Sequence, residues 1–320
     1  MASTTQELIK KGFQISNKGI STSFRQKIEM ISSHYGSVNS FLKAKRSDFE
    51  KIVYVVDKPN FKLTYNEYQK LLAFQKSGLI DSKLSVQQNF VNILTTQFIS
   101  RQLEMIESLK LESLNVNPIL ASALNLNNET DLIRYYVYQA ISRSIVTSVG
   151  FLVQDLLLYA SDIVVEGRDD ELGEETKWDL VVEKLDEVKA FLEIKSGTND
   201  VNKAQIHHYR KEFEFIENKG FKAFIGETYG KRADQTVTHG LYKQYLPDWE
   251  KRTLIGKELW AFVSGEENYH QSLIDHLFKT SSTILRNDTF IKKIEKRIKP
   301  LILEFRTKHK NYQVFLKSLW

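Results

Sequence analysis

Apolar residues recur at every third or fourth position through most of residues 3–110, as in FRQKIEMISSHYGSVNSFL and FVNILTTQFISRQLEMIESL. This spacing gathers apolar side chains on one face of a helix, so the first third of the chain is predicted to be mostly helical. Residues 111–130 are rich in Asn and Ser and contain Pro118, and we interpret them as a linking segment. A second long helical pattern runs from Asp131 to about Ala160.

The centre of the chain has the pattern of a buried sheet. A short apolar run, DIVVEG, and a charged segment that we expect to be a loop, RDDELGEET, precede residues 177–197, KWDLVVEKLDEVKAFLEIKSG. In these residues the apolar positions alternate as in two strands. A tight turn near Asp186 and Glu187 would make the two strands antiparallel.

A helix and a further strand are predicted after this hairpin. The helix covers KAQIHHYRKEFEFIEN, with Asn199 or Asp200 as its N-cap and Gly220 at its end. FKAFIGETYG reads as another buried strand, and residues 256–320 return to helix. Strands and a helix that follow a long helix predict an α/β (α+β) fold with a mixed β-sheet flanked by helices.

The charge distribution allows a polyanionic partner. The net charge is +5, and Lys and Arg are in excess at both ends of the chain, whereas residues 151–200 are acidic. Basic flanks around an acidic centre suit a protein that binds phosphates and holds a cation, although solvated charged surfaces give the same pattern.

Several classes of protein are excluded by what the sequence lacks. It contains no cysteine, so disulfides, thiolate zinc sites and cysteine nucleophiles are ruled out. The first residues lack an apolar signal core, and the most apolar stretch carries Arg134, Arg143, Gln154 and Asp155, which does not suit a membrane span. We therefore expect a cytoplasmic protein without a membrane partner.

The predicted hairpin carries charged residues at the end away from its turn. Side chains alternate faces along a strand, so Glu193 and Lys195 share one face, and the position of the turn places Asp179 beside Glu193. Two adjacent carboxylates repel each other, and a half-buried pair left alone is unstable unless one binds a proton. A hard divalent cation would relieve this repulsion.

Mg²⁺ suits this arrangement because it takes oxygen ligands and keeps several waters. Asp179, Glu193, the main-chain carbonyl of Ile194 and a substrate phosphate would supply its remaining ligands. Lys195 would then polarise the attacking water and stabilise charge on the phosphate, as in phosphodiester hydrolysis. The alternative interpretation is a surface ion pair, because Glu-x-Lys is common on strands.

These residues, DLVVEK followed by FLEIKSG, resemble the D…(D/E)-x-K core of the PD-(D/E)xK nuclease superfamily, which includes most type II restriction endonucleases. The resemblance covers about residues 131–230. It implies that Asp179 and Glu193 are metal ligands and that Lys195 is the catalytic lysine. Trp178 stands where the name-giving proline would be, a position that varies freely in the superfamily.

A second segment, RTLIGKELWAFVSG, resembles the G-x-x-x-W-x-F-x-x-G segment that follows the nuclease core in several type II restriction enzymes. We expect its Trp260 and Phe262 to be core aromatic residues.

The resemblance implies a PD-(D/E)xK restriction-endonuclease-like core between helical N-terminal and C-terminal regions. Residues 1–115 would bind DNA or form a dimer, and residues 116–255 would form the nuclease core. Residues 256–320 would complete the catalytic domain or contact DNA or a second subunit.

The function implied is that of a Mg²⁺-dependent type II restriction endonuclease, which hydrolyses phosphodiester bonds in a specific double-stranded DNA sequence. Such an enzyme would be a homodimer in a prokaryotic cytoplasm and would be accompanied genetically by a cognate DNA methyltransferase. The alternatives are a structure-selective or repair nuclease of the same superfamily and a non-catalytic DNA-binding protein in which the hairpin is only structural.

Additional acidic residues are candidates for the metal site. Asp155, in the long helix, resembles the acid that many members of the superfamily place near the metal, and Asp162 and Glu183 are alternatives for this role. A single acid on a long helix is also a common ion-pair partner of a basic residue.

Two segments offer candidate DNA contacts, since recognition needs side chains with hydrogen-bond donors on helices or loops that reach a groove. Lys203 and Gln205 lie where related nucleases contact phosphate or order the catalytic lysine. The polar segment 227–245 follows a core strand and is either a solvated connection or a DNA-contacting loop, with these candidate residues: Lys231, Arg232, Gln235 and His239.

Overall fold

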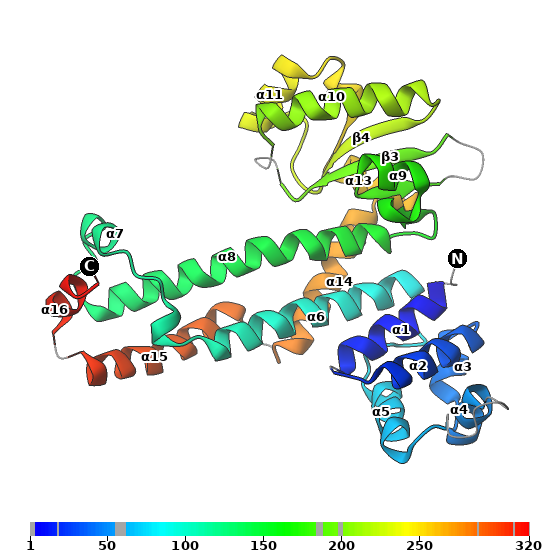
Figure 1. Ribbon diagram of the computed structural model, residues 1–320, viewed down its shortest axis with the longest axis horizontal. Coiled ribbons are helices and arrows are strands. Elements are labelled where there is room, and N and C mark those ends of the chain that lie inside the picture. Colours follow the sequence, from blue (N-terminus) through cyan, green and yellow to red (C-terminus); the bar gives the residue numbers. More distant parts are fainter. Residues whose placement is uncertain are drawn as a thin grey trace. The chain divides into compact units, whose positions relative to one another are not determined.

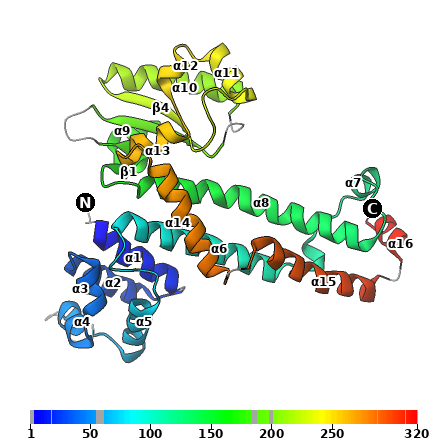
Figure 2. The same cartoon turned by 180° about the vertical axis from the view of Figure 1, so that it is seen from behind.

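The structure is a computed structural model that describes residues 4–17, 19–54, 62–183, 188–197, 201–286, 288–309 and 311–319 (Figures 1 and 2). The chain forms two compact units, residues 1–95 with 153–277 and residues 96–152 with 278–320. The predicted turn residues Asp186 and Glu187 and the predicted caps Asn199 and Asp200 lie outside the described residues. The three functional regions expected from the sequence stay a prediction.

The described part of the first 95 residues is mostly helical, as its apolar spacing predicts. The helices are α1 (Thr4–Ser16), α2 (Thr22–His34), α3 (Val38–Lys43), α4 (Arg46–Val53), α5 (Tyr65–Lys76) and the beginning of α6 (Val86–Ser108). Phenylalanines fill their shared core, where the ring of Phe13 meets those of Phe24 and Phe74 edge to face. The apolar faces of short amphipathic helices thus cover one another.

A mixed sheet forms the centre of the same unit (Figure 1). Its order is β1-β2-β3-β4-β5, and the strands are β1 (Val164–Glu166), β2 (Leu180–Val182), β3 (Ala190–Lys195), β4 (Lys222–Glu227) and β5 (Thr253–Ile255). β1, β2 and β3 are antiparallel neighbours, whereas β3, β4 and β5 run parallel. The predicted fold class and the antiparallel pairing of the hairpin strands are confirmed.

Helices flank both faces of this sheet. On one face α10 (Lys203–Asn218) and α11 (Val237–Tyr245) share a core with the sheet, in which Phe213 and Tyr242 join Phe191 and Ile225. On the other face α13 (Lys257–Ser264) packs Leu259 against Gly226. Short helices η2 (Gly167–Asp169), α9 (Glu171–Thr176) and α12 (Trp249–Arg252) connect the strands, and α14 (Tyr269–Ile284) follows α13.

The structure corrects three details of the sequence prediction. The charged segment expected to be a loop forms η2 and α9, because the Asp170 carboxylate accepts the Leu172 N–H and caps the helix. Helix α10 is capped by Asn202, whose Oδ1 accepts the Gln205 N–H while Gln205 Oε1 accepts the Asn202 N–H. The short strand β5 was not predicted.

The described residues of the second unit are mostly helical. It holds the rest of α6, η1 (Leu111–Ser113), α7 (Pro118–Ala123), most of α8 (Glu129–Leu158), the end of α14, α15 (Phe290–Lys308) and α16 (Tyr312–Lys317). Helix α8 matches the predicted long helix, and its length and apolar composition would suffice to cross a membrane. However, its residues Leu132, Tyr136 and Val137 are buried in the core of this unit beside Ile298 of α15.

Gly167 fixes the backbone next to Asp179. Its N–H donates to the Asp179 carbonyl at 2.9 Å, and a Cβ at this position would collide with the Trp178 carbonyl oxygen. Only glycine allows this close approach between η2 and the start of β2.

We expect Gly167→Ala to lower the free energy of unfolding by at least about 2 kcal/mol, because backbone must move to admit the methyl group. Urea denaturation followed by circular dichroism measures this change. Gly240→Ala is the control, since a Cβ there meets open space and should stabilise α11 by about 0.5–1 kcal/mol. Equal stabilities of the two variants would contradict the assigned role of Gly167.

Candidate active site

Asp179 lies at the junction of β2 and β3. The register places Leu180 opposite Leu192. One residue earlier, the Asp179 N–H donates to the Leu192 carbonyl at 3.1 Å, and Asp179 Oδ2 accepts the Ile194 N–H at 2.8 Å. The Asp179 side chain is therefore held against the carboxyl end of β3.

The Ile194 carbonyl points to the edge of β3 that faces Asp179. In an extended strand the N–H and C=O of one residue point to the same side, and those of the next residue point to the other. The Ile194 N–H bonds Asp179, whereas the Lys195 carbonyl accepts the Thr228 N–H on the β4 side at 3.1 Å. The expected metal-ligand carbonyl is thus directed toward the expected metal-ligand carboxylate.

Glu193 and Lys195 form a half-buried pair on the face of the sheet that α10 covers. Lys195 Nζ lies 2.7 Å from Glu193 Oε1, and the Tyr209 hydroxyl donates to the same oxygen at 3.0 Å. The ammonium also lies 5.3 Å from the centre of the Tyr209 ring. Tyr209, which we did not predict, therefore orients both charged residues.

Burial and mutual repulsion perturb these groups. Burial is the largest influence on the pKa of Asp179, the Glu193 carboxylate acts in the same direction, and the pKa is raised to about 6. The Ile194 N–H, Lys195 and Gln154 partly oppose this rise. Burial lowers the pKa of Lys195, but its hydrogen bond to Glu193 and the nearby Tyr209 hydroxyl outweigh burial and raise it. Lys195 is a cation at neutral pH.

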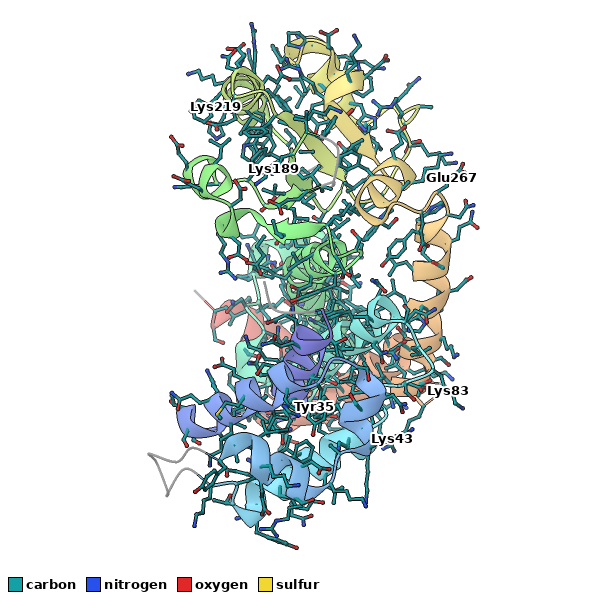
Figure 3. All side chains as sticks on the ribbon, turned by 90° about the vertical axis from the view of Figure 1, so that its right-hand side faces the viewer. Tyr35, Lys43, Lys83, Lys189, Lys219 and Glu267 are labelled. Carbon is teal, nitrogen blue, oxygen red and sulfur yellow. The ribbon has the colours of Figure 1, made fainter. Side chains whose placement is uncertain are left out.

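Helix α8 supplies one contact to the site. Gln154 Nε2 donates to Asp179 Oδ1 at 3.0 Å, whereas the carboxylate of the neighbouring Asp155 is paired with Lys11 at 3.1 Å. Consecutive residues on a helix point about 100° apart, so only one of the two faces Asp179. Glu183, an alternative candidate acid, pairs instead with Lys189, which is labelled in Figure 3. Asp162 is exposed between α8 and β1.

The donor set fits a hard divalent cation. Two carboxylates and a carbonyl converge where burial, and then repulsion by Glu193, raises the pKa of Asp179, and a cation would offset both effects. No group of three or more His, Cys, Asp and Glu side chains that could hold a metal occurs among the described residues. An ion here would therefore depend on the main chain, water and substrate as well as on Asp179 and Glu193.

The candidate DNA contacts on α10 lie at its first turn. Lys203 is exposed, and its ammonium lies 4.5 Å from the centre of the Tyr245 ring. Gln205 is half-buried, and its Oε1 closes the capping box with Asn202. Tyr209 follows Gln205 by four residues, one helical turn further along the same face, and this spacing is the signal that could have identified it.

The candidates after β4 differ in accessibility. Lys231 and Gln235 are exposed. Arg232 donates to the Thr253 carbonyl at 2.8 Å and pairs with Glu258. His239 is only 1% exposed and bonds Glu227.

A mixed sheet whose central strand carries Glu193 and Lys195, beside an aspartate at the start of the antiparallel neighbour, defines a nuclease fold of the PD-(D/E)xK type. The model of the family described as "Type II restriction endonuclease EcoO109I" matches residues 85–283, more than half of the chain, including the whole sheet. The chain belongs to this family. A comparison with curated proteins gives no match.

Membership of this family has consequences at a coarse level. The protein is a nuclease of the hydrolase class whose substrate is DNA. Type II restriction endonucleases generally use a divalent metal ion.

The raised pKa of Asp179 predicts a pH-dependent effect of removing its charge. The unfolded carboxyl titrates at about pH 4, so the folded protein, with a pKa of about 6, binds the proton more tightly. The free energy of unfolding therefore falls as the pH rises through this interval. Asp179→Asn should stabilise the metal-free protein by up to about 3 kcal/mol at about pH 7.5, and by little at about pH 4.

Urea denaturation in EDTA at both pH values measures the difference. Asp288→Asn is the control, because hydrogen bonding to the Thr289 N–H lowers the pKa of that exposed carboxyl, and its removal should not stabilise the protein. A stabilisation by Asp179→Asn that is the same at both pH values would show that its carboxyl does not titrate as described.

Proposed function

We propose that this protein is a Mg²⁺-dependent type II restriction endonuclease that cleaves a specific sequence in double-stranded DNA. The observation that carries the proposal is the convergence of Asp179, Glu193 and Lys195 at the carboxyl end of β3, with Lys195 Nζ 2.7 Å from Glu193 Oε1. Membership of a type II restriction endonuclease family supports it.

Each residue has a distinct role in this proposal. Asp179, Glu193 and the Ile194 carbonyl would hold Mg²⁺, which when bound neutralises charge on the phosphate and acidifies a water molecule. Lys195 orients the attacking water and stabilises the negative charge that develops on the phosphate. Gln154 and Tyr209 keep Asp179 and Glu193 in place. Asp155 would have to leave Lys11 to join the site as a further acid.

The wider context follows from cleavage of both DNA strands. A two-fold homodimer presents one active site to each strand of a palindromic sequence, and two-fold dimers are the commonest assembly. A cognate DNA methyltransferase would protect the same sequence in the cell. We place the enzyme in the cytoplasm of a prokaryote, without a membrane partner.

Incubation of the purified protein with plasmid DNA and Mg²⁺ tests this function against its alternatives. A restriction endonuclease yields discrete fragments, and sequencing of their ends gives the cleaved site. A structure-selective or repair nuclease, the second candidate, yields a smear or cuts branched DNA. A non-catalytic DNA-binding protein leaves the plasmid intact.

Removal of either carboxylate should abolish Mg²⁺-dependent cleavage. We expect Asp179→Ala and Glu193→Ala to lower the rate by at least several orders of magnitude, because uncatalysed phosphodiester hydrolysis is extremely slow. DNA binding, measured by gel shift, should persist or tighten as repulsion falls. Glu214→Ala, which removes an exposed α10 carboxylate paired with Arg210, is the control. Unimpaired cleavage by either site variant would refute the assignment.

Lys195→Gln distinguishes catalysis from simple ion pairing. As a catalytic residue, Lys195 should contribute about 100-fold or more to the single-turnover rate on saturating DNA, while metal and DNA affinity change far less. As an ion-pair partner alone, it would affect the stability of this half-buried pair but leave activity nearly intact. Lys189→Gln, directly before β3, is the matched control because Lys189 pairs with Asp170 and Glu183.

A further inference from the structure

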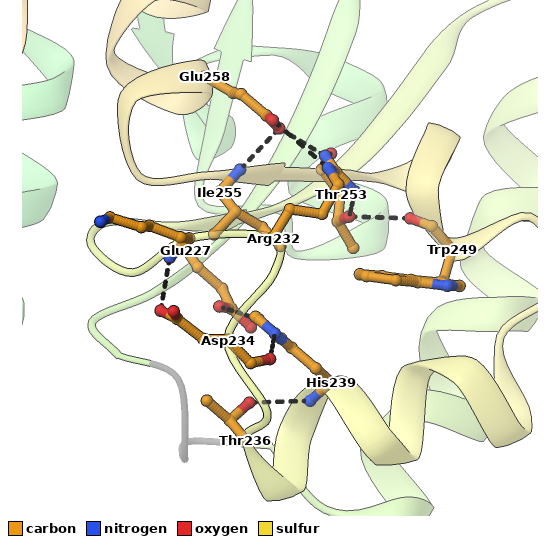
Figure 4. Close-up of polar contacts among 10 residues, drawn as sticks. Glu227, Arg232, Asp234, Thr236, His239, Trp249, Thr253, Ile255 and Glu258 are labelled. Carbon is orange, nitrogen blue, oxygen red and sulfur yellow. Dashed lines mark hydrogen bonds and ion pairs between the residues drawn. The ribbon is translucent and has the colours of Figure 1, made fainter.

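The loop that follows β4, residues 228–236, is fixed from within by polar side chains (Figure 4). Arg232 donates from Nη1 to Thr253 Oγ1 at 2.9 Å and from Nη2 to the Thr253 carbonyl at 2.8 Å. It also pairs with Glu258 of α13, and its guanidinium lies 5.4 Å from the centre of the Trp249 ring. Arg232 thereby ties the middle of the loop to β5 and to the helices beside it.

His239 fixes the end of this loop. Its Nδ1 lies 2.9 Å from the Asp234 carbonyl oxygen and its Nε2 lies 3.0 Å from Glu227 Oε2. Because a carbonyl oxygen can only accept, Nδ1 carries a hydrogen and the ring is held in one orientation. Both side chains of the Glu227–His239 pair are at most 1% exposed. Thr236 accepts the His239 N–H and caps α11.

Every second residue from Tyr229 in the loop to Val237, the first residue of α11, points outward. Gly230, Arg232, Asp234 and Thr236 are half-buried, whereas the intervening residues are exposed: Tyr229, Lys231, Ala233, Gln235 and Val237. Tyr229 is 61% exposed and Val237 is 74% exposed, so both side chains are open to solvent. The loop thus displays an aromatic ring, an ammonium, an amide and an apolar side chain on a fixed backbone.

This display begins beside the catalytic residues. The Thr228 N–H donates to the Lys195 carbonyl at 3.1 Å, and Thr228 Oγ1 donates to the Ser196 carbonyl at 2.9 Å. The Trp260 indole N–H donates to the Thr228 carbonyl at 2.8 Å. The Tyr229 hydroxyl lies so close to Gly197 that a Cβ there would collide with it. The first residue of the loop, Thr228, therefore contacts Lys195 and the residue that follows it.

We infer that the outward side chains of residues 229–237 read the base pairs next to the scissile phosphate. This inference rests on the proposed function, because the site at Lys195 places that phosphate at the start of the loop. Gln235 presents the paired amide donor and acceptor that match adenine, and Lys231 presents the donor that matches guanine. Val237 offers an apolar contact for a thymine methyl group. Arg232 and His239 hold the loop and do not themselves reach the bases.

Rigidity is the physical advantage of this arrangement. A loop that is already ordered loses little conformational freedom on binding, so more of the contact energy distinguishes one base from another. The hydrogen bond between Thr228 and Lys195 also couples base recognition to cleavage. A displaced loop would displace the end of β3, which carries Lys195.

The test records binding separately from hydrolysis. The full-length protein selects duplexes from a pool with randomised base pairs, with Ca²⁺ as the bound cation because it takes the same oxygen ligands as Mg²⁺. The recovered duplexes are sequenced. We expect the wild-type protein to enrich one motif, and Gln235→Ala and Lys231→Ala each to lower enrichment at one or two adjacent positions by at least about tenfold.

Two matched controls accompany these variants. Gln244→Ala removes an exposed amide at the other end of α11, and Lys222→Ala removes an exposed ammonium at the amino end of β4; both should keep the wild-type motif. Thermal unfolding checks that all four variants fold. A motif unchanged in both loop variants, or no motif for the wild-type protein, would overturn the inference. If the wild-type protein enriches a motif that the loop variants lose, but does not cleave DNA with Mg²⁺, the proposed function is overturned. Recognition of bases by the loop then still holds.

Discussion

The burial of the Asp179 carboxylate beside that of Glu193 is the constraint around which the candidate site of the first unit is organised. Burial and the repulsion between the two carboxylates raise the pKa of Asp179 to about 6, so the fold must hold a charge pair that its own energetics disfavour. The Ile194 N–H and Gln154 stabilise one carboxylate, and Lys195 with Tyr209 stabilises the other. Groups with strongly perturbed pKa values commonly cluster at functional sites. A bound cation would offset the repulsion between the two carboxylates.

The parallel strands β3, β4 and β5 connect the two carboxylates to the loop after β4. The register of β3 and β4 places Lys195 beside Glu227, and the Gly256 N–H donates to the Glu227 carbonyl at 2.8 Å. Gly256 has a φ of 55° and lies against the Gly230 carbonyl, where a Cβ would collide. The glycine and tryptophan of the segment RTLIGKELWAFVSG thus support the loop after β4, a role that core packing alone would not suggest.

The sequence was most informative where strand periodicity determines position. Alternating apolar residues in DLVVEK and FLEIKSG were sufficient to predict the hairpin and the proximity of Asp179 to Glu193, because the register leaves little freedom.

Contacts that depend on helix phase were not predictable. Gln154 and Asp155 are neighbours in sequence, and only the packing of α8 decides that Gln154 meets Asp179. The sequence around His239 is typical of a polar loop, yet His239 is buried and bonds the buried Glu227. β5 is too short for its pattern to be distinguished from the loops around it.

The interrupted course of the second unit along the chain affects how it is made. Its hydrophobic core joins residues between Ile106 and Ile141 with residues between Ile294 and Leu316, and the strands of the nuclease sheet lie between them in sequence. During synthesis at about 5–20 residues per second, the first half emerges about 8–30 seconds before the second. Its apolar side chains stay exposed to solvent for that time. The aromatic core of the first 95 residues, in contrast, can form as soon as these residues have been synthesised. The nascent chain is therefore most exposed to aggregation or chaperone capture after its N-terminal helices have folded and before its last helices appear.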